Sequence, residues 1–130
     1  MKEFIISVGI LALIFTGNAI TEKNTDNIVT ETIDSLHEVR EEISKEDTKI
    51  DTKEANKKID EIHKQWDENY ETLAYYIEHN ELEKVETEMT ALRAYIEKDA
   101  YTEALPELDK TVYIINHIKD KTSISLKNIF

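Results

Sequence analysis

The chain contains few of the residues that end helices or make tight turns. Only two glycines and one proline occur among 130 residues, and glutamate, lysine, isoleucine and leucine are common. Glycine and proline are the strongest helix breakers, whereas the common residues are compatible with long helices. The sequence therefore predicts an all-α fold built from a small number of long helices.

One segment differs from the rest of the chain. After Lys2, an uncharged apolar run extends from Phe4 to Ile20. As a helix it would be about 25 Å long, at the short end of what crosses a hydrocarbon core of about 30 Å. The run is apolar on all sides, which is typical of a membrane segment and not of a core helix in a soluble protein. Lys2 and the amino group should remain cytoplasmic, which places the rest of the chain outside the membrane.

The fate of this segment is open at the level of sequence. Gly17-Asn18-Ala19 offers the small residues that a signal peptidase recognises, so cleavage near Ala19 would release a secreted protein. We favour an uncleaved, single-pass anchor. The expected organisation is a membrane anchor or signal segment in residues 1–21 and an extracytoplasmic domain in residues 22–130.

Charge and cysteine content exclude several classes of function. The formal net charge is -12, so the surface repels the phosphate backbone of nucleic acids, and no nucleic-acid partner is expected. The sequence has no cysteine, which excludes disulfides, cysteine zinc sites, thiol nucleophiles and a lipid-modified cysteine.

Beyond the anchor, apolar residues recur every three or four positions, which is the spacing of amphipathic helices. The first helix is predicted from about Asp26 to Lys45 and the second from about Thr52 to His79, with a break at Glu46–Lys49. The first stripe comprises Val29, Ile33, Leu36, Arg40 and Ile43. The second comprises Ala55, Ile59, Ile62, Trp66, Asn69, Leu73 and Tyr76, so Trp66 is predicted to anchor the core.

The stripe of the second helix loses its phase after Tyr76, which indicates a bend or a break. Asn80 and Glu83 have the spacing of a capping box, in which each side chain bonds a backbone N–H at the start of a helix. His79 would then close the preceding helix, where a partial positive charge interacts well with the dipole. The sequence favours a tight helix–helix turn, with His79, Glu83 and Glu86 as alternative ligands of a metal ion.

A third helix is predicted to end near Lys98, and Asp99 is suited to be the N-cap of a fourth. Pro106 would kink this fourth helix if it begins at Ala100 and would be tolerated if Thr102 is the cap. The third stripe comprises Leu82, Val85, Met89, Leu92 and Ile96, and the fourth comprises Tyr101, Leu105, Leu108, Val112 and Ile115. The apolar end of the chain, SISLKNIF, is predicted to dock onto the bundle, with an exposed binding peptide as the alternative.

Two acid-x-x-His pairs raise the question of a di-metal site in the bundle, Asp34 with His37 and Asp60 with His63. Each member lies one position past a core residue, so all four should project to the flank of the bundle or to solvent. No serine lies in a Gly-x-Ser-x-Gly elbow, and the sequence has no glycine-rich loop. No catalytic residues and no cofactor are therefore predicted.

Several aromatic residues lie mostly off the predicted stripes, and tyrosine is enriched at protein interfaces. The candidate interface residues are Tyr70, Tyr75, Tyr95, Tyr113 and, at the end of the chain, Phe130. The alternative for each tyrosine is partial burial on the second face of its helix.

Several short motifs occur along the chain in a fixed order. They are the N-terminal apolar segment, Trp66, the block YIEHNEL from Tyr76 to Leu82, Asn116-His117-Ile118 and the terminal Leu126-Lys127-Asn128-Ile129-Phe130. Together they resemble the bacterial family of a domain of unknown function, DUF4363, found in clostridia and their relatives. The resemblance implies a small membrane-anchored helical protein of Gram-positive bacteria without an established activity, whose signature residues are turn and docking positions. Pro106 is not expected as a family feature.

We therefore expect an antiparallel bundle of four helices behind a membrane anchor at residues 4–20. The expected function is that of a non-enzymatic protein–protein interaction module, accessory to another membrane or envelope protein. The alternative is a metal- or ligand-binding helical protein that uses His79, Glu83 and Glu86. The sequence leaves the identity of the partner and the oligomeric state open.

Overall fold

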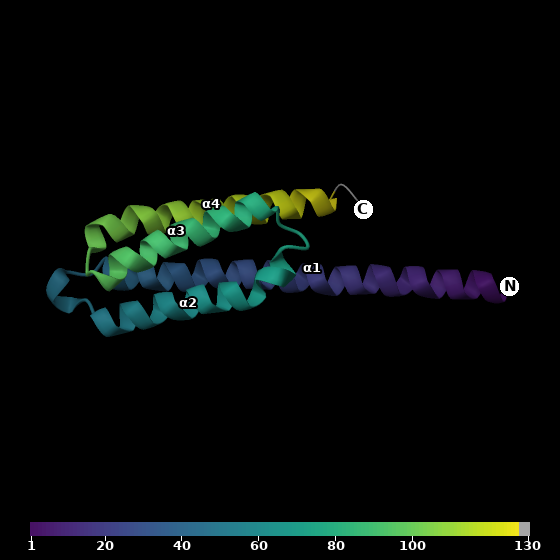
Figure 1. The fold of residues 1–130 in the computed structure, drawn as a ribbon, viewed down its shortest axis with the longest axis horizontal. Coiled ribbons are helices and arrows are strands. Elements are labelled where there is room, and N and C mark those ends of the chain that lie inside the picture. Colours follow the sequence, from purple (N-terminus) through teal and green to yellow (C-terminus); the bar gives the residue numbers. More distant parts are fainter. Residues whose placement is uncertain (128–130) are drawn as a thin grey trace.

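The computed structural model describes the backbone of residues 1–127 and the side chains of residues 1–123. The described residues form four α-helices and one short 3-10 helix: α1 (Lys2–Ile43), η1 (Asp47–Lys49), α2 (Thr52–Leu73), α3 (His79–Glu97) and α4 (Tyr101–Lys127). Successive helices run antiparallel, and the N-terminal half of α1 extends beyond the other three (Figure 1). The predicted all-α bundle is confirmed.

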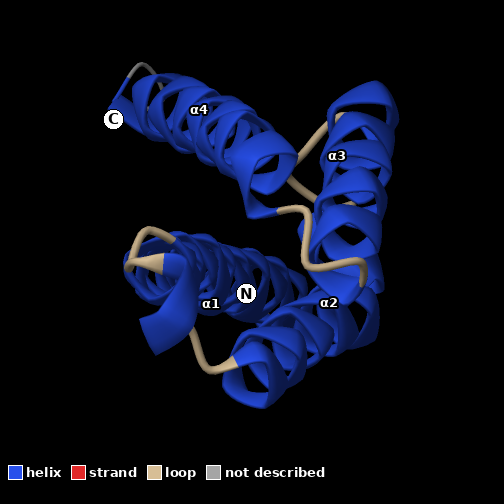
Figure 2. Ribbon diagram, turned by 90° about the vertical axis from the view of Figure 1, so that its left-hand side faces the viewer, coloured by secondary structure: helices blue, strands red, loops and turns tan. Residues whose placement is uncertain are grey.

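Each helix packs on two neighbours. Contacts join α1 to α2 and α4, and α3 to α2 and α4, so the view along the bundle shows the helices at the corners of a square (Figure 2). The α1–α2 connection and the α3–α4 turn lie at one end (Figure 1). The α2–α3 turn and the last part of α4 lie at the other end, beside the middle of α1 (Figure 1).

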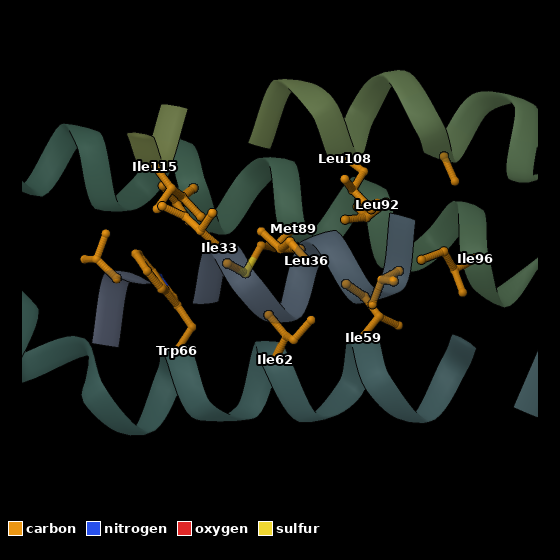
Figure 3. Close-up of a cluster of buried hydrophobic side chains, with 14 of the residues drawn as sticks. Ile33, Leu36, Ile59, Ile62, Trp66, Met89, Leu92, Ile96, Leu108 and Ile115 are labelled. Atoms are coloured by element: carbon orange, nitrogen blue, oxygen red, sulfur yellow. The ribbon is translucent and has the colours of Figure 1, made fainter. Parts of the chain in front are cut away.

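A single apolar core runs through the bundle, with buried side chains from all four helices. Ile59, Ile62 and Trp66 of α2 point into the same space as side chains of α1, α3 and α4 (Figure 3). Trp66 is 1% exposed, which confirms its predicted core position. The predicted stripe of α3 is buried at every position: Leu82, Val85, Met89, Leu92 and Ile96.

The stripes of α1 and α4 are rotated slightly from the predicted ones. In α1, Val39 is buried in place of Arg40, whose exposed guanidinium pairs with Asp109 of α4 (Nε–Oδ1 2.7 Å). A straight helix turns by about 20° per heptad relative to a strict seven-residue repeat, so a stripe extended by fixed spacing drifts off the buried face. The buried residues of α4 are Ala104, Leu108, Thr111, Ile115 and Ile118.

The predicted start of the first helix near Asp26 is wrong, because α1 is one unbroken helix of 42 residues. The hydroxyl groups of Thr21 and Thr25 bond the carbonyl oxygens of Gly17 and Thr21, at 2.8 and 3.0 Å. These polar side chains are thus satisfied within the helix, and no proline interrupts it. The apolar segment and the first helix of the bundle therefore form one continuous helix.

The connection from α1 to α2 occurs at the predicted break. Asp51 is the N-cap of α2, and its carboxylate accepts the backbone N–H groups of Lys53 and Glu54 at 3.1 and 3.0 Å. Glu42 is buried and accepts the backbone N–H of Asp51 at 2.9 Å. Hydrogen bonds from Lys45 and from this N–H lower the pKa of Glu42.

The predicted end of the second helix at His79 is wrong, and so is the predicted capping box. α2 ends at Leu73, and His79 is the first residue of α3, with Asn80 and Glu83 inside that helix. The chain leaves α2 early and buries Ile77, which is 4% exposed. Burying an isoleucine is worth about 2 to 3 kcal/mol, more than the roughly 1 kcal/mol of a side-chain cap.

Asp99 is not the N-cap of α4; it ends α3. Its φ of 56° lies in the left-handed region. The backbone N–H of Ala100 donates to the Tyr95 carbonyl at 2.9 Å, and that of Asp99 to the Ile96 carbonyl at 3.0 Å. This pair of bonds is a Schellman motif, in which glycine usually occupies the position of Asp99. Because α4 begins at Tyr101, Pro106 lies in its second turn.

The helix α4 continues to Lys127, so the first part of SISLKNIF extends this helix. The side chains of residues 124–127 and the whole of residues 128–130, including Phe130, lie outside the described residues. Docking of this terminal segment therefore stays a prediction.

Candidate functional site

The N-terminal half of α1 is apolar and exposed. Among the described residues, α1 is the one helix that is long and apolar enough to cross a membrane, and none of its apolar window is buried. Phe4 and Leu13 are 70% and 73% exposed. A contiguous apolar surface of this kind marks contact with a membrane or with a partner. Residues 4–20 are therefore a candidate membrane anchor.

The α2–α3 turn meets α1 where this apolar segment ends. The Tyr76 hydroxyl lies 2.9 Å from the Asn18 backbone carbonyl oxygen, and the Asn18 side-chain oxygen is a second acceptor for the same proton. Burial, followed by the nearby Glu22 carboxylate, raises the pKa of Tyr76, so its hydroxyl stays protonated as a donor. An open groove of about 460 Å³ adjoins this contact and is lined by Leu13, Ile14, Gly17, Asn18, Thr21, Tyr75 and Tyr76.

The end of α4 is tied to the same turn by ion pairs. Lys121 Nζ lies 2.7 Å from Glu78 Oε1 and 3.3 Å from Glu81 Oε1. The hydrogen bond that Lys121 donates, followed by the charge of its ammonium group, lowers the pKa of Glu78. Lys119 Nζ donates to Thr30 Oγ1 at 2.9 Å and so connects α4 to α1. The anchor, the turn and the end of α4 therefore form one connected end of the bundle.

A second pocket lies between α1 and α4 near this end, with a volume of about 380 Å³. Its walls combine charged and hydroxyl side chains with one buried valine. The lining residues are Glu22, Lys23, Thr25, Asp26, Val29, Lys119, Thr122 and Ser123.

The alternative metal site around His79 is brought together only in part. Both ring nitrogens have partners: the Tyr70 hydroxyl lies 3.0 Å from Nδ1, and Glu83 Oε1 lies 3.0 Å from Nε2. Glu86 instead shares a hydrogen bond with Asp67 of α2, which together with burial raises the pKa of Glu86. His79 and Glu83 form a surface pair that Glu86 does not join.

The two acid-x-x-His pairs also do not converge. Asp34, His37 and Asp60 are exposed, and Asp60 pairs with Arg93 of α3 (Nε–Oδ1 2.8 Å). His63 is half-buried, with Nδ1 at 3.3 Å from Asp67 Oδ2. Among the residues that the structure describes, no group of three His, Cys, Asp or Glu side chains could hold a metal ion.

A carboxylate pair between α3 and α4 was also not expected from the sequence. Lys110 Nζ lies 2.7 Å from Glu88 Oε2 on α3 and 3.5 Å from Glu107 Oε1 on its own helix. Glu107 and Glu88 also share a hydrogen bond. This bond, followed by burial, raises the pKa of Glu107, and the same bond lowers the pKa of Glu88. The sequence contains one hint of this pair: each glutamate directly precedes a residue of a predicted apolar stripe, Met89 or Leu108, on adjacent helices.

The candidate interface tyrosines fall into two groups. Tyr75 and Tyr113 are exposed at 80% and 74%, and Tyr95 is less exposed, at 36%. Tyr70 packs partly against the core and bonds His79. Only the first group is thus free to meet a partner or a membrane.

The family model described as a domain of unknown function, DUF4363, matches residues 20–129 of the chain. This match begins at the last residue of the apolar run and covers the whole bundle as far as it is described. No curated protein and no solved structure matches the chain.

Proposed function

The chain belongs to the DUF4363 family, as its resemblance indicated, and we propose that it is a non-enzymatic membrane-anchored module that holds or regulates another membrane or envelope protein. The continuity of α1 carries this proposal. A single helix about 63 Å long has an exposed apolar half and a half that is part of the bundle core. Because this helix is continuous, the anchor is joined to the bundle without a flexible linker.

The proposed topology has the end that bears Lys2 in the cytoplasm and the bundle outside. The support is the positive-inside rule, applied to the apolar run that follows Lys2. An uncleaved anchor is further supported by the contact between Tyr76 and Asn18. Cleavage near Ala19 would remove this acceptor and leave the Tyr76 hydroxyl without it.

A non-enzymatic role is supported by how the polar side chains are used. Several of the histidines and acids singled out in the sequence form ion pairs or hydrogen bonds within a helix or between helices, such as His79 with Glu83 and Asp60 with Arg93. The exposed Tyr113 offers a partner the kind of large, rigid contact residue that interfaces favour.

Membrane fractionation combined with the intact mass of the mature chain tests the anchoring. We expect the protein in the membrane fraction, resistant to extraction by carbonate and high salt, with a mass that includes residues 1–19. A mature chain that begins at Ile20 and is found in the medium would overturn the proposal.

Site-specific photocrosslinking in intact cells tests the partner. A photoreactive residue at Tyr113 should yield one recurrent crosslinked membrane or envelope protein. The matched control is the same residue at Lys64, which is 75% exposed on α2. Equal crosslinking from both positions, or crosslinks to copies of the chain alone, would contradict a specific partner surface at Tyr113.

A further inference from the structure

Tyr75 is exposed in an unusual place. It is an aromatic residue with 80% of its surface exposed, and it lies in the turn that meets the apolar half of α1. It borders the same groove as Leu13, Ile14 and Gly17 of the apolar run. In water, this arrangement would leave an aromatic ring beside an apolar helix with neither of them covered.

The position of the turn along α1 sets its depth relative to the anchor. Leu13 precedes Ile20, the last residue of the apolar run, by seven residues, which is about 10 Å along the helix axis. Tyr76 is bonded to α1 at Asn18, still within that run. If the run lies in a membrane, the turn cannot stand clear of the lipid headgroups.

We propose that the α2–α3 turn is a second membrane contact, in which Tyr75 inserts into the headgroup region of the bilayer beside the anchor. The proposal rests on the membrane anchoring of α1 proposed above. The occupant of the groove is lipid, because the groove is continuous with the surface that the anchor presents to the membrane. Tyrosine is enriched at this depth, where its ring meets apolar chains and its hydroxyl meets water.

The backbone of the turn is compatible with this environment. The N–H groups around Tyr75 are bonded to the last turn of α2, and those of Tyr76 and Ile77 both donate to the Leu73 carbonyl, at 3.0 and 2.9 Å. Unsatisfied backbone groups are costly near hydrocarbon, so these bonds lower the cost of bringing this part of the turn close to it.

Two acids next to the turn share a cation. Lys121 pairs with Glu78 and Glu81, the two acids that follow Tyr75 most closely along the chain, so these three side chains carry a net charge of -1 and not -2. The whole chain has a formal charge of -12 and is repelled by anionic lipids. This pairing reduces the local repulsion at the end of the bundle that approaches the membrane.

The absence of cysteine from the sequence allows a direct measurement of depth with single spin labels. The full chain is reconstituted in nanodiscs of phosphatidylcholine and phosphatidylglycerol. Nitroxide labels are placed at Tyr75→Cys, at Tyr113→Cys and at Leu11→Cys in separate samples. The relaxation of each label by oxygen, which partitions into lipid, is compared with its relaxation by a water-soluble nickel complex. The ratio of the two reports depth even where a groove restricts access.

We expect the Leu11→Cys label to report the hydrocarbon, the Tyr75→Cys label the headgroup region, and the Tyr113→Cys label bulk water. Tyr113 is the matched control because it is almost as exposed as Tyr75 but lies on α4. A Tyr75→Cys label as water-exposed as that at 113, with Leu11→Cys in lipid, would overturn the second contact and leave the anchor standing. Water exposure at Leu11→Cys would instead overturn the anchor. Lipid exposure at all three positions would mean that the bundle lies flat, which also contradicts a contact confined to the turn.

Both labelled tyrosines are exposed and make no side-chain hydrogen bond among those described, so the substitutions should leave the bundle folded. Tyr76 is not substituted, because it bonds Asn18. An unchanged thermal melt of each labelled protein verifies the fold. If the melt of the Tyr75→Cys protein shifts, its label is moved to Ala74→Cys, the adjacent exposed position in the turn.

Discussion

The two halves of α1 share one backbone conformation but have opposite surroundings. From Phe4 to Ile20 every side chain is exposed, whereas from Val29 to Ile43 one face is buried against α2 and α4. The first half is apolar on all sides and the second on one side only. The candidate anchor and the bundle part of α1 therefore do not differ in helical conformation. They differ in how apolar residues are distributed around the helix axis.

This difference shows that one continuous helix can carry two kinds of surface. A stripe can be buried by neighbouring helices, because only part of the circumference needs cover. An apolar circumference on a helix that projects beyond its neighbours has no such cover within the part of the chain that the structure describes. Substitutions that act on one half and spare the other test the comparison directly.

The largest effect is expected at Trp66. Trp66→Ala should lower the free energy of unfolding of the bundle by about 3 to 5 kcal/mol, because it leaves a large cavity in the core. Its Nε1 is buried without a hydrogen-bond partner, so Trp66→Phe loses volume but also removes an unsatisfied donor. Urea unfolding followed by circular dichroism should therefore rank the two variants, with Phe well above Ala. Membrane association should not change in either variant, and equal losses of stability would contradict the core assignment.

Two leucines of α1 provide a matched pair. Leu36 is fully buried, whereas Leu11 is 53% exposed on the projecting half. Leu36→Ala should destabilise the bundle by about 2 to 5 kcal/mol. Leu11→Ala should leave its unfolding unchanged within the error of the same urea titration. A loss of stability at Leu11 would show that the projecting half is buried by a protein contact, as in a dimer.

A charge placed on the projecting half of α1 should weaken membrane association and leave the stability of the bundle unchanged. Leu11→Lys places an ammonium group near the centre of the candidate span, which costs about 3 kcal/mol for membrane insertion. The fraction of the protein in the membrane should fall, while the melting temperature of the bundle stays unchanged. Leu11→Ala is the control, because it removes the same side chain without adding charge. Full membrane retention of the lysine variant would argue against a lipid-spanning α1.

A smaller effect is expected at the turn that closes α3. Asp99 adopts a left-handed conformation that glycine adopts without steric penalty, so Asp99→Gly should stabilise the bundle by about 1 kcal/mol. Ala94→Gly, in an ordinary helical position of the same helix, should have the opposite sign and a similar size. Thermal melts of the two variants measure the difference. Destabilisation by Asp99→Gly would mean that the bond from Tyr101 to the Asp99 carboxylate outweighs the backbone strain.

The sequence predicts those parts of the fold that depend on periodicity. The stripe from Leu82 to Ile96 is correct at every position, and the single tryptophan is correctly placed in the core. Apolar spacing is a property of one helix and can be read without knowledge of its neighbours.

The errors occur where a tertiary contact decides between local alternatives. The spacing of Asn80 and Glu83 suits a cap, but burial of Ile77 shifts the turn towards Leu73. Asp99 suits an N-cap, yet it ends the preceding helix. The local preference for a cap at Asn80 is worth about 1 kcal/mol, which the burial of Ile77 exceeds.

The polar contacts between helices could not be predicted at all. The pairing of Glu88 with Glu107, or of Tyr76 with Asn18, depends on the relative register of two helices. The register is set by how the apolar stripes of the two helices interlock. The spacing of apolar residues within one helix does not determine it.

The smallest effect is expected at the carboxylate pair of α3 and α4, which has no counterpart in the projecting half of α1. A hydrogen bond from Glu107 to Glu88, followed by burial, raises the pKa of Glu107. A carboxyl group whose pKa is higher in the folded state binds its proton more tightly there. Its contribution to stability is present below the ordinary glutamate range and is lost as the pH rises through the raised value.

Glu107→Gln keeps a hydrogen-bond donor towards Glu88 at every pH and removes the titrating proton. The variant should therefore match the original chain near pH 4 and become progressively more stable than it as the pH approaches 7. Melting temperatures across this range measure the trend. Glu103→Gln, an exposed position on the same helix, removes the same charge and should show no such divergence. If Glu107→Gln is instead less stable at pH 7, the 3.5 Å contact of ionised Glu107 with Lys110 outweighs its repulsion by Glu88, and the two carboxylates do not share a proton.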